Sequence, residues 1–191
     1  LYLPVLLMLI ALVFRGVAFE FRFKAKTLRR AWGIAFWLGS VFAAFAQGVI
    51  LGAIVEGMPL QEGKYVGGAF GWFSPFSMLT GLSVMSGYAL LGATWLILKT
   101  DGGTQRVART LARPLTLNVF GFIGLVSAWL PFLDSRVMAR WFEGDRFLWL
   151  FPVPLLVLAV TWALWRAVPR GDREARPFML SLCLFLLGFV G

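Results

Sequence analysis

Residues 31–55 read AWGIAFWLGSVFAAFAQGVILGAIV and contain no charged side chain between Arg30 and Glu56. A helix needs about 20 predominantly apolar residues to cross the roughly 30 Å hydrocarbon core of a bilayer. This run is long enough, so it predicts a membrane-spanning helix. The rest of the chain supports the same class, because 60% of its 191 residues are hydrophobic and only 14% are charged. A typical soluble domain has about 25% charged residues.

Five further apolar runs approach or reach the same length. We expect spans at residues 1–19, 31–55, 72–98, 114–133, 147–165 and 177–191. Helices are expected because an open sheet edge in lipid leaves backbone groups unpaired. The predicted fold class is therefore all-α, a polytopic transmembrane helix bundle that forms a single transmembrane domain over residues 1–191.

Both ends of the chain fall within apolar runs. Residue 1 is Leu and not Met, and the last run has only 15 uncharged residues. We therefore expect the chain to be an internal piece of a longer membrane protein, incomplete at both ends.

Basic residues are unevenly shared between the connections that join the predicted spans. The connections near residues 20–30, 99–113 and 166–176 carry 13 Lys and Arg residues, against 4 in the other two. Cytoplasmic loops carry an excess of such residues. We therefore expect these three loops to be cytoplasmic. We therefore interpret the net charge of +9 as a sign of how the chain is oriented in the membrane, and we expect no nucleic-acid partner.

The residue inventory limits the chemistry of the chain. It has no histidine, and its one cysteine is Cys183, within an apolar run. Haem, zinc and iron–sulfur sites usually draw on histidine or several cysteines, and a Ser-His-Asp triad needs histidine. We expect no catalytic, cofactor-binding or metal-binding residue in this chain.

Arg15 lies within the predicted span 1–19, and Glu20 directly follows it. At about 100° per residue they lie roughly 140° apart on an unbroken helix, so they should not pair with each other. One interpretation is an interfacial arginine and a solvated carboxylate. The other is a polar cluster that shapes proton access from the cytoplasm.

Small residues recur within two of the predicted spans. Gly48 and Gly52 have G-x-x-x-G spacing, and Gly81 and Gly87 lie in residues 72–98 among Ser and Thr. Such residues let helices approach closely, so we expect the four glycines to serve helix packing. A polar lining for a ligand or quinone pocket is the alternative.

Several short motifs make the chain resemble a known family, subunit II of the cytochrome bd-type quinol oxidases, including the cyanide-insensitive branch. The motifs are FRGVAFEFR at residues 14–22, Trp32, Gly39-Ser40, Gln47-Gly48-Val49, Ser74-Pro75-Phe76 and Gly92-Ala93-Thr94-Trp95. The resemblance is specific over the first three spans and general in character over the last three.

The resemblance implies a haem-free subunit of a bacterial inner-membrane complex that oxidises quinol and reduces O2 to water. The chain would be the third to eighth helix of a nine-helix subunit. Haem b and haem d, and with them the catalytic centres, are expected on the partner, subunit I. This subunit would support its partner in the lipid bilayer, contribute to proton or oxygen access, and hold a structural quinone. Arg15 and Glu20 match family positions near the cytoplasmic proton entrance.

Two other functions remain open from the residues themselves. A small-solute transporter also has polar groups within its spans, although the six runs show no evident inverted repeat. A purely structural membrane scaffold is the second alternative.

Overall fold

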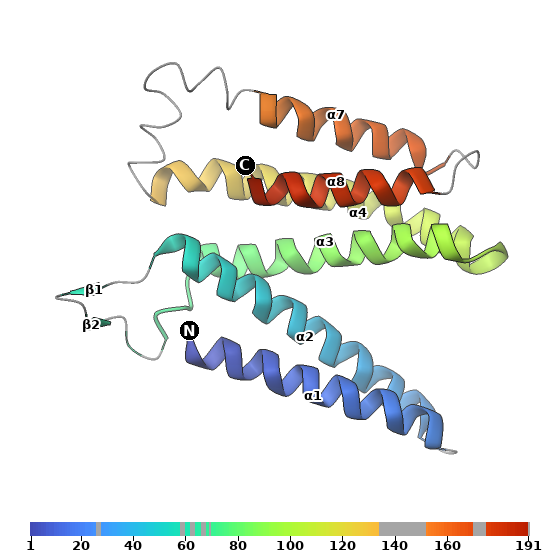
Figure 1. The fold of residues 1–191 in the computed structure, drawn as a ribbon, viewed down its shortest axis with the longest axis horizontal. Coiled ribbons are helices and arrows are strands. Elements are labelled where there is room, and N and C mark those ends of the chain that lie inside the picture. Colours follow the sequence, from blue (N-terminus) through green and yellow to red (C-terminus); the bar gives the residue numbers. More distant parts are fainter. Residues whose placement is uncertain are drawn as a thin grey trace. The chain divides into compact units, whose positions relative to one another are not determined.

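The computed structural model describes residues 1–25, 28–57, 60–61, 64–65, 68, 70–133, 152–169 and 175–190. In these residues the fold is all-helical apart from one small hairpin, as predicted (Figure 1). The helices are α1 (Tyr2–Lys24), α2 (Arg29–Glu56), α3 (Pro75–Lys99), α4 (Gly102–Leu133), α7 (Pro152–Ala167) and α8 (Ala175–Val190). Strands β1 (Leu60–Gln61) and β2 (Lys64–Tyr65) pair antiparallel.

Four of the helices, α1 to α4, are long and apolar enough to cross a membrane. Helices α7 and α8 are apolar too, but each has 16 described residues. At 1.5 Å per residue this is about 24 Å, less than the roughly 30 Å of hydrocarbon. The predicted span 147–165 begins at residues 147–151, which lie outside the described residues, as does residue 191 of the last predicted span.

Two of the predicted loops are wrong in their extent. Most of residues 20–30 belongs to α1 or α2, and all of residues 102–113 is helical in α4. Hydropathy marks only the part of a helix that lies in hydrocarbon, whereas the helix continues through good helix formers such as Ala108 and Arg109. The chain instead turns between α3 and α4 at Gly102, whose φ of +68° is accessible to glycine. In the third predicted loop, 166–176, residues 170–174 are outside the described part.

The chain divides into two compact units, residues 1–85 and 86–191, and α3 contributes to both. In the first unit, α1 and α2 form an antiparallel helical hairpin (Figure 1). Their contact is close at Gly39, where an added Cβ would lie 3.0 Å from the Ala11 carbonyl oxygen and 3.1 Å from Arg15 Cβ. Because Gly39 has no side chain, the side chain of Arg15 can extend from α1 along the surface of α2.

The second unit has its own apolar core. α7 packs against both α8 and α4, and the core includes Leu90, Ile97, Ala112, Leu164 and Leu184, all nearly inaccessible to solvent. Buried hydroxyls accompany these side chains. Thr94 and Ser181 lie 2.7 Å apart, oxygen to oxygen, and join α3 to α8.

Candidate functional site

Arg15 lies in the second half of α1, on the side that meets α2. Its guanidinium carbon is 5.4 Å from the centroid of the Phe36 ring, a cation–π geometry. Phe36 in turn contacts Phe19 of α1, with ring centroids 6.1 Å apart. Within the described residues, the arginine therefore contacts an aromatic ring of the neighbouring helix and forms no ion pair with a carboxylate.

Glu20 lies one and a half turns further along α1 and has a different partner. Its carboxylate accepts a hydrogen bond of 2.8 Å from the Lys24 ammonium, four residues later. The two side chains are 68% and 72% exposed, so the pair is open to water. Arg15 and Glu20 are thus on one helix but have separate partners, because their directions on the helix diverge.

Aromatic rings surround this end of the α1–α2 hairpin. Phe19 packs edge-on against Phe23, with centroids 5.1 Å apart, and Phe21 stacks on Trp32 at 5.0 Å. The Glu20 carboxylate therefore leaves the helix between two aromatic contacts. The paired Glu20 carboxylate is thus exposed at an end of the hairpin that carries several aromatic rings.

Helices α2 and α3 cross in backbone contact at three of the four glycines. A Cβ added to Gly48 would lie 2.7 Å from Gly81 Cα and 2.8 Å from the Thr80 carbonyl oxygen. One added to Gly52 would lie 2.7 Å from Ser77 Cα. At Gly48 and Gly52 a larger side chain would meet the backbone of α3, whereas a Cβ added to Gly81 would meet the Phe45 ring at 2.8 Å.

Gly87 lies in the second unit and faces a side chain rather than a backbone. An added Cβ would lie 2.8 Å from two ring carbons of Phe185 in α8. The same ring contacts Tyr88, with centroids 5.5 Å apart. Gly87 therefore admits an aromatic ring between α3 and α8.

A polar contact at the other end of α2, between Glu56 and Ser74, was not predicted from the sequence. The Ser74 hydroxyl donates a hydrogen bond to the Glu56 carboxylate, which joins the end of α2 to the start of α3. Ser74 also caps α3, since its hydroxyl accepts from the Ser77 amide at 3.0 Å while the Ser77 hydroxyl accepts from the Ser74 amide at 3.1 Å. A serine just before an apolar run is an N-cap signal, and the Ser74 cap explains why α3 begins at Pro75 and not at the predicted residue 72.

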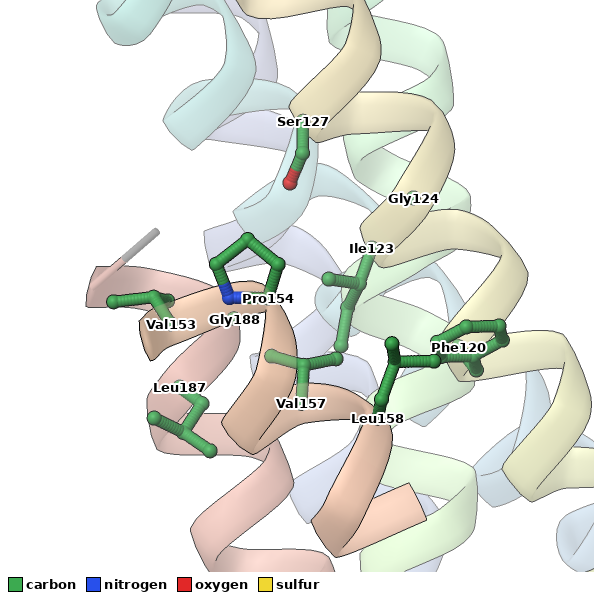
Figure 2. A pocket seen from close by; sticks show the side chains of 10 residues that line it. All are labelled: Phe120, Ile123, Gly124, Ser127, Val153, Pro154, Val157, Leu158, Leu187 and Gly188. Carbon is green, nitrogen blue, oxygen red and sulfur yellow. The ribbon is translucent and has the colours of Figure 1, made fainter. Parts of the chain in front are cut away.

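The second unit holds an apolar cavity of about 240 Å³ between α4, α7 and α8. Figure 2 shows side chains from the three helices around it, with the Ser127 hydroxyl as the one polar side-chain group among those drawn. Such a lining favours a hydrocarbon ligand over a polar one.

The sequence offers few of the side chains that usually hold haem iron or zinc. The sequence has no histidine, and its single cysteine, Cys183, is a free and exposed thiol on α8. Within the described residues, no group of three or more acidic or cysteine side chains is placed to hold a metal ion.

Comparison with known proteins matches the whole of the chain to one family. The family described as cytochrome bd terminal oxidase subunit II matches residues 1–191. A probable cytochrome oxidase subunit 2 of Haemophilus influenzae is 27% identical over 190 residues, which cover 83% of this chain and 50% of that protein.

Two further relatives carry more specific names. Cytochrome bd ubiquinol oxidase subunit 2 of Bacillus subtilis is 31% identical over 162 residues, covering 83% of this chain and 46% of the relative. Cytochrome bd-I ubiquinol oxidase subunit 2 of Escherichia coli K12 is 27% identical over 145 residues, covering 72% and 38%. The chain thus spans half or less of the length of these curated relatives.

Proposed function

The chain belongs to the cytochrome bd terminal oxidase subunit II family, and on that premise we propose that it is part of a respiratory complex that oxidises quinol and reduces O2 to water. The match over residues 1–191 is the observation that carries the proposal. Two relatives are named as ubiquinol oxidase subunits, which favours quinol as the reductant. No comparison favours the small-solute transporter.

In this proposal the chain is the haem-free subunit and a partner subunit holds haem b and haem d. The support comes from the residues, because haem iron is usually held by histidine or a cysteine thiolate. This chain has no histidine, and its one cysteine is exposed on α8. Its task is then to support the haem-bearing subunit I in the membrane.

We extend the proposal to six spans within one transmembrane domain over residues 1–191. They would be the third to eighth helices of a nine-helix subunit in the bacterial cytoplasmic membrane. The match to 38–50% of the length of longer relatives is compatible with this placement. The bias in Lys and Arg supports a cytoplasmic side for the connections near residues 20–30, 99–113 and 166–176. The glycines at positions 48, 52, 81 and 87 would serve helix packing.

A structural quinone belongs to the same proposal. The cavity between α4, α7 and α8 has the apolar lining that an isoprenoid tail requires. Quinone and lipid are thus the small-molecule partners that we assign to this chain.

The identity of the complex is tested by a reduced-minus-oxidised spectrum of the full-length protein purified from its native membrane. We expect haem b and haem d bands to copurify with the subunit. A haem-free preparation that exchanges a solute across vesicle membranes would contradict the oxidase proposal and favour the transporter.

For the Arg15 and Glu20 region we propose a role in proton access from the cytoplasm. Its support is the exposure of the Glu20 carboxylate, which lets it exchange protons with water. Glu20→Gln keeps the size of the side chain but removes its charge, and we expect it to slow O2 reduction about 100-fold, at the lower end of the range for a lost proton-transfer group. Turnover is measured with an oxygen electrode on the assembled complex.

Lys24→Gln is the matched control, because it breaks the Glu20–Lys24 pair yet leaves the carboxylate in place. It should retain most of the turnover. Full turnover of a well-assembled Glu20→Gln complex would favour a solvated carboxylate with no part in proton transfer.

A further inference from the structure

Two arginines of the second unit lie over neighbouring tryptophan rings. The guanidinium carbon of Arg113, on α4, is 5.5 Å from the centroid of Trp165, and that of Arg166, on α7, is 3.6 Å from the centroid of Trp162. Trp162 and Trp165 are three residues apart on α7, so they are neighbours on one face of that helix. We call Arg113, Trp165, Trp162 and Arg166 the arginine–tryptophan strip.

A third arginine holds α4 and α7 together beside this strip. Arg109 donates a hydrogen bond of 2.7 Å from Nη1 to the carbonyl oxygen of Val168. The last carbonyls of a helix lack partners within the helix, and a cation there is favourable. Because Arg109 and Arg113 are one turn apart on α4, this bond also fixes where Arg113 meets α7.

The strip lies at the boundary between apolar and polar sequence. Arg113 directly precedes the apolar run 114–133, and Arg166 directly follows the apolar run 147–165. Tryptophan is enriched at this level of a bilayer, where lipid headgroups meet hydrocarbon. We therefore expect the two guanidinium groups to lie at headgroup depth.

Neither guanidinium is neutralised by the part of the chain that the structure describes, where the one ion pair is Lys24–Glu20. Both arginines are exposed. A guanidinium that stacks on an aromatic ring keeps its planar N–H edge available, and that edge matches a phosphate in bidentate fashion. The strip thus presents two guanidinium groups, each beside a tryptophan ring, that can bind phosphate.

Apolar side chains continue from the strip toward the membrane interior. Leu117 lies one turn beyond Arg113 on α4, and Leu158 lies one turn before Trp162 on α7. They are 53% and 51% exposed, respectively. A molecule bound to the strip through phosphate would have hydrocarbon surface directly below it.

We propose that the arginine–tryptophan strip binds the headgroup of an anionic phospholipid, with the acyl chains against α4 and α7. Charge complementarity, headgroup depth and the apolar surface below all match this one ligand, and basic sites between membrane helices are suited to such headgroups. The site requires only that the helices cross a membrane, so it stands independently of the oxidase activity.

The test uses the complete complex that contains this chain, purified and stripped of lipid. Phosphatidylglycerol and phosphatidylcholine are titrated separately, and bound lipid is counted by native mass spectrometry. We expect one phosphatidylglycerol to bind more tightly than any phosphatidylcholine. Each basic side chain near an anionic surface strengthens binding about fivefold, so Arg113→Gln with Arg166→Gln should weaken this lipid about 25-fold.

The matched control is Arg22→Gln with Arg29→Gln, which removes the same charge from two exposed arginines outside the strip. It should leave the tightly bound phosphatidylglycerol in place. Equal weakening in both double variants, or in neither, would overturn the site.

A second variant keeps the charge and the fold. Arg113→Lys with Arg166→Lys retains two cations but loses the planar fork, so we expect an intermediate loss of affinity. Unchanged affinity in this variant would contradict bidentate binding on a stacked guanidinium. Loss of the partner subunit from the Gln double variant, with lipid binding intact, would assign the strip to a protein interface and overturn the proposal.

Discussion

Helix α3 is packed in two different ways along its length. In the first unit its backbone meets that of α2 at Gly48, Gly52 and Gly81. In the second unit it meets α8 through side chains, with Phe185 against Gly87 and the Thr94–Ser181 hydroxyl pair. The first contact brings backbone atoms of α3 against Gly48 and Gly52, and the second consists of a ring and hydroxyls.

The difference between the two contacts indicates which helix interface tolerates a larger side chain. Lipid is as apolar as the helices, so helix association depends on close packing and on hydrogen bonds between helices. Backbone atoms cannot move aside without shifting a whole helix, whereas a ring can rotate. We therefore expect the α2–α3 crossing to be the more sensitive of the two.

The largest effect should come from Gly48→Ala. The new methyl group meets Gly81 Cα at 2.7 Å and the Thr80 carbonyl oxygen at 2.8 Å, so the helices must separate. Overpacking of this kind costs typically about 1–3 kcal/mol, and we expect a destabilisation of about 3 kcal/mol for this variant. Thermal unfolding of the purified complex measures the loss of stability.

Gly33→Ala in the same helix is its control, because an added Cβ there has no atom within 4 Å. Alanine favours a helix over glycine by about 1 kcal/mol, so this variant should be neutral or slightly stabilising. Similar unfolding temperatures for the two variants would contradict the backbone contact at Gly48.

A smaller effect is expected for Gly87→Ala, at about 1 kcal/mol, near the lower end of the overpacking range. The methyl group meets only ring carbons of Phe185, at 2.8 Å, and the ring can turn away. Gly87→Ala combined with Phe185→Leu should recover part of the loss. If Gly87→Ala proved as damaging as Gly48→Ala, the distinction between backbone and ring contacts would fail.

The smallest effect is expected for Thr94→Val. It removes the 2.7 Å contact with Ser181 but preserves the shape of the side chain. Hydrogen bonds between membrane helices contribute about 0.6 kcal/mol on average, and Ser181 keeps its bond of 2.8 Å to the Phe178 carbonyl. Thr110→Val is the reference, because Thr110 is exposed and its hydroxyl bonds within its own helix. If Thr94→Val lowers the stability no more than this reference, the α3–α8 hydroxyl contact adds no stability.

Much of the fold could be predicted because hydropathy reports directly on membrane helices. The uncharged residues 31–55 lie entirely within α2, and residues 114–133 form the second part of α4. The helix ends were harder to place. The Glu20–Lys24 pair lies in the last turn of α1, the α3 start depends on the Ser74 cap, and α4 begins well before its apolar run. These features come from hydrogen bonding and helix propensity rather than from hydrophobicity.

The candidate site was only half visible in the sequence. Arg15 and Glu20 stood out as charges near a span, and their divergence on a helix followed from the helical period. The Phe36 ring that holds Arg15, and the Glu56–Ser74 hydrogen bond, join residues far apart along the chain. No local pattern indicates which residues of two different helices will meet.

The sequence by itself determined that this is an all-helical membrane protein without the histidines that haem usually requires, because composition and run length are properties of single segments. The tertiary structure alone decided that Gly48 faces Gly81, that Thr94 meets Ser181, and that Arg113 and Arg166 share a strip of tryptophans. Those pairings depend on the rotation and crossing of helices about one another. In lipid, that geometry is set by side-chain fit and hydrogen bonds between helices, which hydropathy does not record.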